Sequence, residues 1–542
     1  MELDETTDVV VVGSGAAGLA AALTAAVGGA RVIVIEKAAV LGGTTAMSGA
    51  GVWIPANHHM LAAGMDDSPA EALAYLRATA PPGWHNEEDA LWRAFATHAP
   101  EMLTFLEAHT PLRFELVQYP DLYPDAPGGK ARGRMLSPLP LRRVLAGPWR
   151  ERIRRSPVPR SLTFRDVNTG VVLRQPLRFA AAMAPRVLWR MLTGQVGMGN
   201  ALTVGLVRGC LDHGCDIRPE TAAQRLITEQ GRVVGVTAQR GDRDLTIRAR
   251  RVVLATGGFE WDIAMLARHF PGPVGLIGSP RTNTGDGHHM AVAAGAALAR
   301  MGEANIYPAT VATYEGQPHA FPLNELSPPH CILVNRHGLR FVNEGAPNPG
   351  IALDARDEGG LPLHLPVWRI FDAQFAARNP LAMWLGRRQP GWFRQAPTIA
   401  ALAQAVDLDP DALVATVARF NRQVGQGRDA DFGRGETAWE KLTAPPGQGG
   451  NPYLGTIERP PFYAAPCHRV ILGTKGGPRT NAQGQALRPD GSVIAGLYCA
   501  GLAMANPIGT KAVGAGTTLG PCLTSGYICG LALTGREGQI QA

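Results

Sequence analysis

The stretch from Asp8 to Glu36 limits most strongly what this chain can fold into. It begins with an unbroken β-branched run, Val9 to Val12, which predicts a strand buried on both faces. A Gly-x-Gly-x-x-Gly motif follows, then an alanine-rich segment and a second apolar run, Arg31 to Ile35. Strand, glycines, helix and strand in this order predict a βαβ unit that binds a dinucleotide.

The three glycines of the motif have different expected roles. Gly13 permits a tight turn, Gly15 lets the backbone approach a pyrophosphate, and Gly18 lets the helix pack closely on the sheet. The helix N-terminus offers unpaired N–H groups and a partial positive charge to the phosphates. Glu36 follows about twenty residues on, where a carboxylate can accept hydrogen bonds from ribose hydroxyls. The cofactor-binding residues expected here are Gly13, Gly15, Ala16, Ala17, Gly18 and Glu36.

Length and composition narrow the class of protein. The chain has 542 residues, more than one hydrophobic core usually spans, so two domains are expected. Hydrophobic residues make up 45% and charged residues 18%, which is typical of a soluble globular enzyme. The sequence has no apolar run long enough for a membrane span, and its acidic start argues against a secretory signal peptide.

Cysteine usage favours a reducing compartment. The seven cysteines are scattered, odd in number and never in a Cys-x-x-Cys pair. This pattern suggests neither a disulfide framework nor a metal site. We therefore expect a cytoplasmic protein with no bound metal.

Positive charge is concentrated in one segment, from about residue 130 to residue 190. Between Lys130 and Arg190 there are fifteen Lys or Arg residues against Glu151 and Asp166. One interpretation is a basic amphipathic segment that contacts an anionic membrane surface peripherally. The other, which we favour, is an arginine-rich lid with packed stems and solvated heads. Nucleic acid binding is disfavoured because no recognised motif accompanies the charge.

Several segments before residue 134 predict defined local structure. Gly42 to Pro55 reads as a loop whose small side chains admit a large ring system and whose hydroxyls bind the ring's polar edge. Ser68 caps a helix that starts with Pro69, and another helix runs from about Glu87 to His109, interrupted at Pro100. A turn-dense loop with two tyrosines follows, from Gln118 to Gly133.

The middle of the chain predicts a return to the first sheet. A helix near Asn200 precedes three alternating runs, expected to form a small antiparallel insertion. The runs are Gln224–Thr228, Val233–Gln239 and Leu245–Val253. The last run leads into Ala255, Thr256 and Gly257, where a second close approach to the cofactor is expected.

A change of character near Thr282 indicates a second domain. Thr284 to Gly287 opens a helix, and the following sequence is richer in proline and aromatics, with one clear helix capped by Asp409. A segment rich in glycine and other small residues occurs again near the C-terminus, where Gly520 and Pro521 precede an apolar helix. We expect an α/β fold: a discontinuous Rossmann-like cofactor domain, residues 1–281 and 464–542, and an α+β substrate-binding cap domain, residues 282–463.

These motifs together resemble the fumarate reductase flavoprotein superfamily and, more closely, bacterial 3-ketosteroid dehydrogenases. The resemblance rests on VVGSGAAGLAAA, GGTTAMSGAGVWIP, YPDLYPDAPGGKARGR, ATGGF, TGDG, ILVNRHGLRFVNE, FNRQVGQGRDADFGRG, NPYLG, PPFYA, TKGGPRTN, GLYCAGLAMA and GAGTTLGP, between residue 8 and about residue 530. It implies FAD without a covalent link, because Thr44 stands where related enzymes can attach the flavin to a histidine. Further implied cofactor-binding residues are Lys37, Gly43, Thr44, Thr45, Ser48, Gly49, Ala255, Thr256, Gly257, Asp286, Gly501, Gly516, Thr518 and Leu519.

The catalytic tyrosines of the ketosteroid 1-dehydrogenases are not carried over. The expected base is replaced by Asn348, and a tyrosine that polarises the ketone is replaced by Ala512. The position of a third tyrosine of that family is occupied by Leu122, and Tyr123 follows it directly. What matches is Gly516, whose backbone N–H donates to the ketone oxygen in that family. These departures argue against steroid 1-dehydrogenation by the usual tyrosines, and Asn348 also argues against an arginine-based dicarboxylate reductase.

The catalytic candidates are therefore Lys511, Gly516, Tyr123 and Asn348. Lys511 could donate to a substrate oxygen, act as a base if desolvation lowers its pKa, bind the flavin, or point outward into an ion pair. The N–H groups near Gly516 could stabilise an enolate, and Asn348 could orient a carbonyl but cannot act as a base. Weaker candidates are Lys475, Tyr307, Tyr314, His288 and His289.

Three functions follow as hypotheses. The first is an FAD-dependent dehydrogenase that introduces a double bond next to the ketone of an apolar, steroid-like or alicyclic substrate, passing hydride to flavin N5 and its electrons to a non-nicotinamide acceptor. The second is the reverse reaction, reduction of an activated alkene. The third is a flavin-binding protein without turnover.

Overall fold

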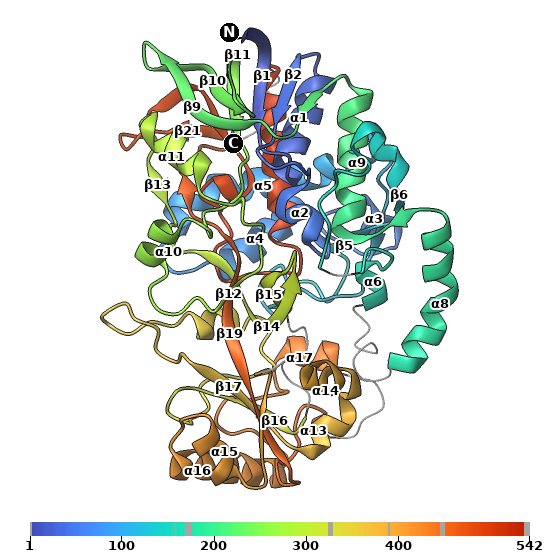
Figure 1. The fold of residues 1–542 in the computed structure, drawn as a ribbon, viewed down its shortest axis with the longest axis vertical. Helices are drawn as coiled ribbons and strands as arrows, with labels where there is room; N and C mark the ends of the chain where they lie inside the picture. The colour runs from blue at the N-terminus through green and yellow to red at the C-terminus, as the bar shows by residue number, and fades with distance from the viewer. Residues whose placement is uncertain are drawn as a thin grey trace.

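The computed structural model describes residues 3–157, 159–167, 176–322, 329–388, 391–444 and 450–535. Residue 158 and residues 168–175 of the expected basic insertion lie outside this range. Two sheets organise the molecule, one in the upper half and one in the lower half of Figure 1.

The first sheet confirms the predicted βαβ unit. Its strands run in the order β21-β22-β11-β1-β2-β8, and β22, β11, β1, β2 and β8 are parallel. Their bounds are β1 (Leu3–Val12), β2 (Val32–Ile35), β8 (Asp216–Arg218), β11 (Arg243–Leu254), β21 (Gln485–Leu487) and β22 (Val493–Cys499). The sheet thus joins strands from both ends of the chain. The predicted antiparallel insertion is β9 (Ala222–Glu229) and β10 (Arg232–Arg240), which leads into β11.

Helices rich in small residues pack beside this sheet. They are α1 (Ala16–Val27), α9 (Met198–Asp212) and the apolar α18 (Leu519–Leu533). α18 also packs against α5 (His85–His109), which follows α4 (Pro69–Thr79). Ser68 caps α4 as predicted, accepting a hydrogen bond from the Glu71 N–H.

The predicted interruption at Pro100 is wrong, because α5 is continuous. A proline removes one backbone donor and crowds the preceding turn. Buried residues on both sides of it, including Trp92 and Met102, pack into the core. This packing along both halves of the helix outweighs the local penalty.

The second sheet has the order β15-β14-β19-β17-β16, with β12 and β18 also paired to β19. The strands are β12 (Leu276–Ile277), β14 (Ala304–Tyr314), β15 (Gln317–Pro322), β16 (Cys331–Val334), β17 (Val367–Phe371), β18 (Arg394–Ala396) and β19 (Phe462–Thr474). The expected domain boundary at residue 463 falls inside β19, which stays in this sheet to Thr474. We therefore keep the two-domain division as a proposal, with that boundary moved past Thr474.

The cap domain has more regular structure than the sequence indicated. The predicted helix is α16 (Pro410–Gly425), capped by Asp409, and it packs with α15 (Ile399–Ala405). The other cap helices are α12 (Gly350–Leu353), α13 (Ala373–Arg378), α14 (Pro380–Arg387) and α17 (Ala438–Thr443).

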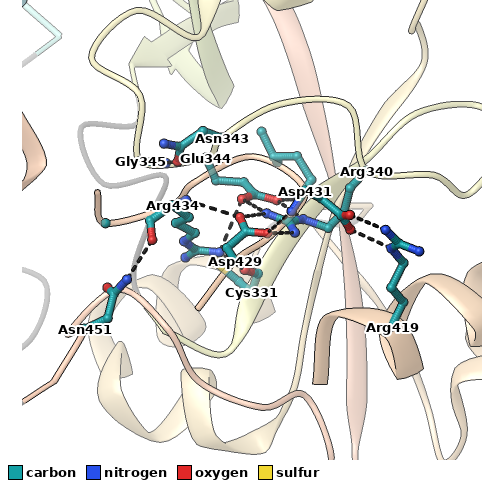
Figure 2. Close-up of polar contacts among 12 residues, drawn as sticks. Cys331, Arg340, Asn343, Glu344, Gly345, Arg419, Asp429, Asp431, Arg434 and Asn451 are labelled. Atoms are coloured by element: carbon teal, nitrogen blue, oxygen red, sulfur yellow. Dashed lines mark hydrogen bonds and ion pairs between the residues drawn. The ribbon is translucent and has the colours of Figure 1, made fainter. Parts of the chain in front are cut away.

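A buried ion-pair cluster ties the cap together (Figure 2). The Arg340 guanidinium contacts Glu344 at 2.8 Å and Asp429 at 2.9 Å. Arg434 donates to the carbonyl of Cys331 at 2.7 Å and lies 3.4 Å from Glu344. The cluster joins the loop after β16 to the loop after α16, so two of the motifs behind the family resemblance have a structural role here.

Candidate active site

A long pocket lies where the glycine motif and the end of β2 face the cap strands. It encloses about 1860 Å³ of empty space, its open mouth included. All the sequence-predicted cofactor residues except Gly18 line it. These are Gly13, Gly15, Ala16, Ala17, Glu36, Lys37, Gly43, Thr44, Thr45, Ser48, Gly49, Ala255, Thr256, Gly257, Asp286, Gly501, Gly516, Thr518 and Leu519.

Gly13 and Gly18 let three backbone segments meet at the pocket wall. Gly13 has a φ of +109°, and a side chain there would overlap the Ala255 carbonyl oxygen. A side chain at Gly18 would overlap the Gly13 carbonyl oxygen. Gly18 therefore allows α1 to pack against the strand, which is the role expected from the motif.

Glu36 is held in the pocket wall by hydrogen bonds. Its Oε2 accepts from the Ser14 hydroxyl at 2.7 Å and the Ser14 N–H at 3.1 Å, and its Oε1 accepts from the Ala38 N–H at 2.9 Å. The Ser14 hydroxyl also accepts from the Gly42 N–H at 3.0 Å. Ser14 was missed by the sequence analysis, although it lies inside the glycine motif.

Lys37 and Asp286 pair with each other while lining the pocket. The Lys37 ammonium lies 2.6 Å from Asp286 Oδ2 and donates to the Thr284 hydroxyl at 2.6 Å. This contact joins the end of β2 to α11 (Asp286–Ala293).

The segment after β2 corrects the expectation of a loop. Gly43 to Met47 forms a short helix, α2. The Thr45 hydroxyl accepts a hydrogen bond from the Ala16 N–H at 3.0 Å, and the Thr44 hydroxyl accepts from Asn283 at 3.1 Å. The two threonine hydroxyls thus bind other protein groups and hold the pocket wall in place. The sequence analysis had expected them to bind the polar edge of a ring.

The residues present fit a dinucleotide cofactor. Gly15 caps α1 without a side chain, so it leaves room near the first helical N–H groups. The Thr256 hydroxyl lines the pocket and is buried with no hydrogen-bond partner among the described residues. A buried polar atom of this kind needs a partner, and a bound cofactor would supply one.

The cap contributes the opposite wall of the pocket. Asn305, His319 and Ala320 line it from β14 and β15, and Leu472 from β19. His319 Nδ1 donates to the Ala320 carbonyl at 2.9 Å, while Nε2 is buried without a partner among the described residues. Burial lowers the pKa of His319, which favours the neutral imidazole. No sequence signal pointed to His319, because it lies in a segment without clear periodicity.

Of the four catalytic candidates, Gly516 alone lines this pocket. It has a φ of +93°, and its carbonyl accepts from the Trp53 N–H at 3.3 Å. Within the described residues, its own N–H has no acceptor. This N–H is therefore free to donate to a ligand.

Lys511, Tyr123 and Asn348 come together beside the loop that leads to Gly516. The Lys511 ammonium lies 4.9 Å from the centre of the Tyr123 ring, and the Asn348 amide donates to the Thr510 carbonyl at 3.1 Å. Burial lowers the pKa of Lys511 and raises the pKa of Tyr123 to about 12. Lys511 thus contacts Tyr123, its neighbour Thr510 binds Asn348, and none of the three candidates lines the cofactor pocket.

The weaker candidates have structural contacts. Lys475 is fully buried and donates to the Gly509 carbonyl at 2.7 Å, and burial lowers its pKa to about 8. His288 is buried, bonds the Gly476 carbonyl at 2.9 Å and has a pKa lowered by burial to about 4. His289 pairs with Asp262, and the Tyr314 hydroxyl donates to a backbone carbonyl. Burial raises the pKa of Tyr307 to about 12.

Comparisons with known proteins agree with this geometry. The family described as FAD binding domain matches residues 8–519. A 3-oxosteroid 1-dehydrogenase from Mycobacterium tuberculosis is 38% identical over 98% of this chain and 99% of that protein. A 4-oxocyclohexanecarboxylate 2-dehydrogenase from Sinomonas cyclohexanicum is 36% identical over 98% of this chain and 93% of that protein.

A solved structure shows the same fold over the whole chain. The 3-ketosteroid delta1-dehydrogenase from Sterolibacterium denitrificans, in complex with 1,4-androstadiene-3,17-dione, superposes with a TM-score of 0.88 at 30% identity. The match covers 98% of this chain and all of that one.

Fold, pocket and comparisons together define a flavoprotein oxidoreductase that uses FAD. Within that class, the chain belongs to the FAD binding domain family and, in it, to the group of the 3-oxosteroid 1-dehydrogenases. It is an FAD-dependent dehydrogenase acting on CH–CH groups, as the sequence predicted.

Proposed function

We propose that this enzyme introduces a double bond next to the ketone of a steroid-like or alicyclic substrate. The observation that carries the proposal is the free Gly516 N–H on the wall of the FAD pocket. Support also comes from the relatives, whose names describe desaturation of a 3-oxosteroid and of 4-oxocyclohexanecarboxylate.

The residues on the pocket wall suit this reaction. A C–H bond beside a ketone becomes acidic only when the developing enolate oxygen is stabilised. The Gly516 N–H can donate to that oxygen. When bound, FAD supplies the hydride acceptor. The glycine motif, Ser14 and Glu36 would hold its pyrophosphate and ribose, with α2 and the 516–519 segment beside its ring.

The proposal is tested by anaerobic mixing of the purified flavoprotein with saturated ketones and, separately, with the matching enones. Loss of the visible flavin absorbance with saturated ketones supports it. Reoxidation of the reduced enzyme by enones, without the first reaction, would instead support an alkene reductase. FAD binding with no spectral response to either series would leave a flavin-binding protein without turnover.

We further propose a non-nicotinamide electron acceptor and a cytoplasmic location. The sequence has no second nucleotide-binding motif, and all seven cysteines are buried thiols outside any disulfide, as is usual in a reducing compartment. None of the described helices is long and apolar enough to cross a bilayer.

We also propose a peripheral membrane contact through α8 (Pro176–Leu192), in place of the arginine-rich lid that we favoured from the sequence, because apolar residues of α8 are exposed. Figure 1 shows this helix at the edge of the molecule, apart from both sheets. Leu177, Ala181, Ala184, Leu188 and Met191 form an apolar stripe at helical spacing, in which Leu177 is 85% and Met191 67% exposed. Arginines flank the stripe within the basic segment. This is the pattern of a helix that lies on an anionic lipid surface.

A further inference from the structure

Lys511 is a cation without a counter-ion beside the active site. Its ammonium stands over the Tyr123 ring, and no described carboxylate lies within ion-pair distance of it. Two charged groups that contact the residues just before Lys511 bind backbone atoms. Glu303 accepts from the Thr510 N–H at 2.6 Å, and Lys475 donates to the Gly509 carbonyl. A half-buried ammonium loses hydration and gains no partner charge here, so an anion would be bound favourably.

The position of Lys511 suits the far end of a small substrate. Gly516 is five positions further along the same loop, a span of at most about 18 Å when fully extended. Turns closed by the Ala512 N–H on Thr510 and the Thr517 N–H on Gly514 shorten it. Lys511 and a ketone bound at the Gly516 N–H would therefore share one short loop, although the lysine does not line the cofactor pocket itself.

We propose that Lys511 binds a carboxylate of the substrate, so that the enzyme prefers alicyclic oxo acids to neutral ketones. This inference rests on the proposed desaturase function. The Asn348 amide is bound to the Thr510 carbonyl, so it steadies the residue before Lys511. The Tyr123 ring lies against the ammonium and limits where an anion can approach.

The test compares 4-oxocyclohexanecarboxylate with its methyl ester, which differs in charge at a single group. Wild type is expected to favour the acid in kcat/KM by roughly 10- to 100-fold, the effect of one charge-assisted hydrogen bond. Lys511→Met should lose most of this preference, because kcat/KM should fall for the acid and stay unchanged for the ester. Lys511→Arg should keep part of the preference. Lys441→Met, an exposed lysine of α17, is the matched control and should behave as wild type.

Binding of cyclohexanecarboxylate, which has no ketone, separates this inference from the proposed function. Its effect on the flavin absorbance should saturate in wild type and weaken by the same factor in Lys511→Met. If neither ketone is turned over but this difference persists, the carboxylate site stands and the desaturase function fails. Equal kcat/KM for acid and ester in wild type would overturn the inference. An equal loss of kcat/KM for acid and ester in Lys511→Met would also overturn it, because the lysine would then act at the ketone that both substrates share.

Discussion

The Ser14 hydroxyl donates a 2.7 Å hydrogen bond to Glu36 Oε2, and this contact joins the glycine turn to the end of β2. Both groups are buried at the pocket wall, where the phosphates and a ribose of FAD are expected. The bond fixes the carboxylate in one orientation before the cofactor arrives. Affinity for FAD should therefore depend on both residues.

Replacing Glu36 by alanine is expected to raise the Kd for FAD roughly 10- to 100-fold, because charged hydrogen bonds to the ribose are lost. Ser14→Ala should have a smaller effect in the same direction. Fluorescence titration of the FAD-free protein measures both constants. Asp66→Ala, at an exposed residue, is the control. An unchanged Kd in Glu36→Ala would show that the carboxylate does not meet the ribose.

Gly18→Ala should destabilise the first domain, because the new Cβ would overlap the Gly13 carbonyl. Overpacking of this kind costs about 1–3 kcal/mol. Urea unfolding of the holoenzyme would show it as a lower free energy of unfolding. Gly302→Ala, where the new Cβ meets nothing within 4 Å, should change little. Equal stability of the two variants would contradict the assigned packing role.

The buried cluster of Figure 2 predicts a large effect from Arg340→Ala. Removing this guanidinium leaves the buried Asp429 without its cation and Glu344 with only Arg434 at 3.4 Å, which costs about 3–5 kcal/mol. Burial alone would raise the pKa of Asp429, but the hydrogen bonds and charge of Arg340, together with backbone N–H groups of Arg434 and Asp431, lower it overall. Thermal unfolding measures the loss.

Arg419 in the same view provides the control for this measurement. It pairs with Asp431 at the exposed edge of the cluster. Arg419→Ala should leave the thermal midpoint nearly unchanged, because solvent screens exposed pairs. A comparable loss in both variants would mean that burial does not determine the cost.

Lys475 predicts a rise in stability at alkaline pH. Burial lowers its pKa in the folded protein to about 8, against an ordinary value of 10.5. Between these two pH values the unfolded chain holds a proton that the folded chain has released, so the free energy of unfolding rises with pH there. The difference between wild type and Lys475→Met, measured at pH 8 and pH 10, isolates this contribution. For Lys441→Met, the difference from wild type in free energy of unfolding should be the same at pH 8 and pH 10. The same result for Lys475→Met would rule out the buried charge.

The apolar stripe of α8 predicts binding to anionic vesicles. Wild type should sediment with phosphatidylserine vesicles more than with phosphatidylcholine vesicles, and salt should weaken the interaction. Leu188→Glu combined with Met191→Glu should abolish it. Leu361→Glu, at an exposed leucine of the cap, is the matched control. Binding that survives the double substitution would refute the contact.

Much of the first domain could be predicted because its signals are local. The β-branched run, the glycine spacing and the Ser68 cap each act within a few residues, as does the Asp409 cap in the second domain, and all appear in the structure. The Pro100 prediction failed for the opposite reason: core contacts from distant segments outweigh a local penalty. In the cap, β19 was missed because its partners β14 and β17 lie far from it in sequence, and the hairpin of β14 and β15 was missed because its segment has no clear periodicity.

The sequence alone determined the FAD-binding βαβ unit, the α/β class and nineteen of the residues that line the pocket. These features depend on residue types and their spacing over short stretches, which the amino-acid sequence contains. Only the tertiary structure decided that Ser14 holds Glu36, that His319 lines the pocket from the cap, and that Lys511 lies over Tyr123 with no counter-ion among the described residues. Such contacts join segments with no common periodicity, and packing alone sets which of their side chains meet.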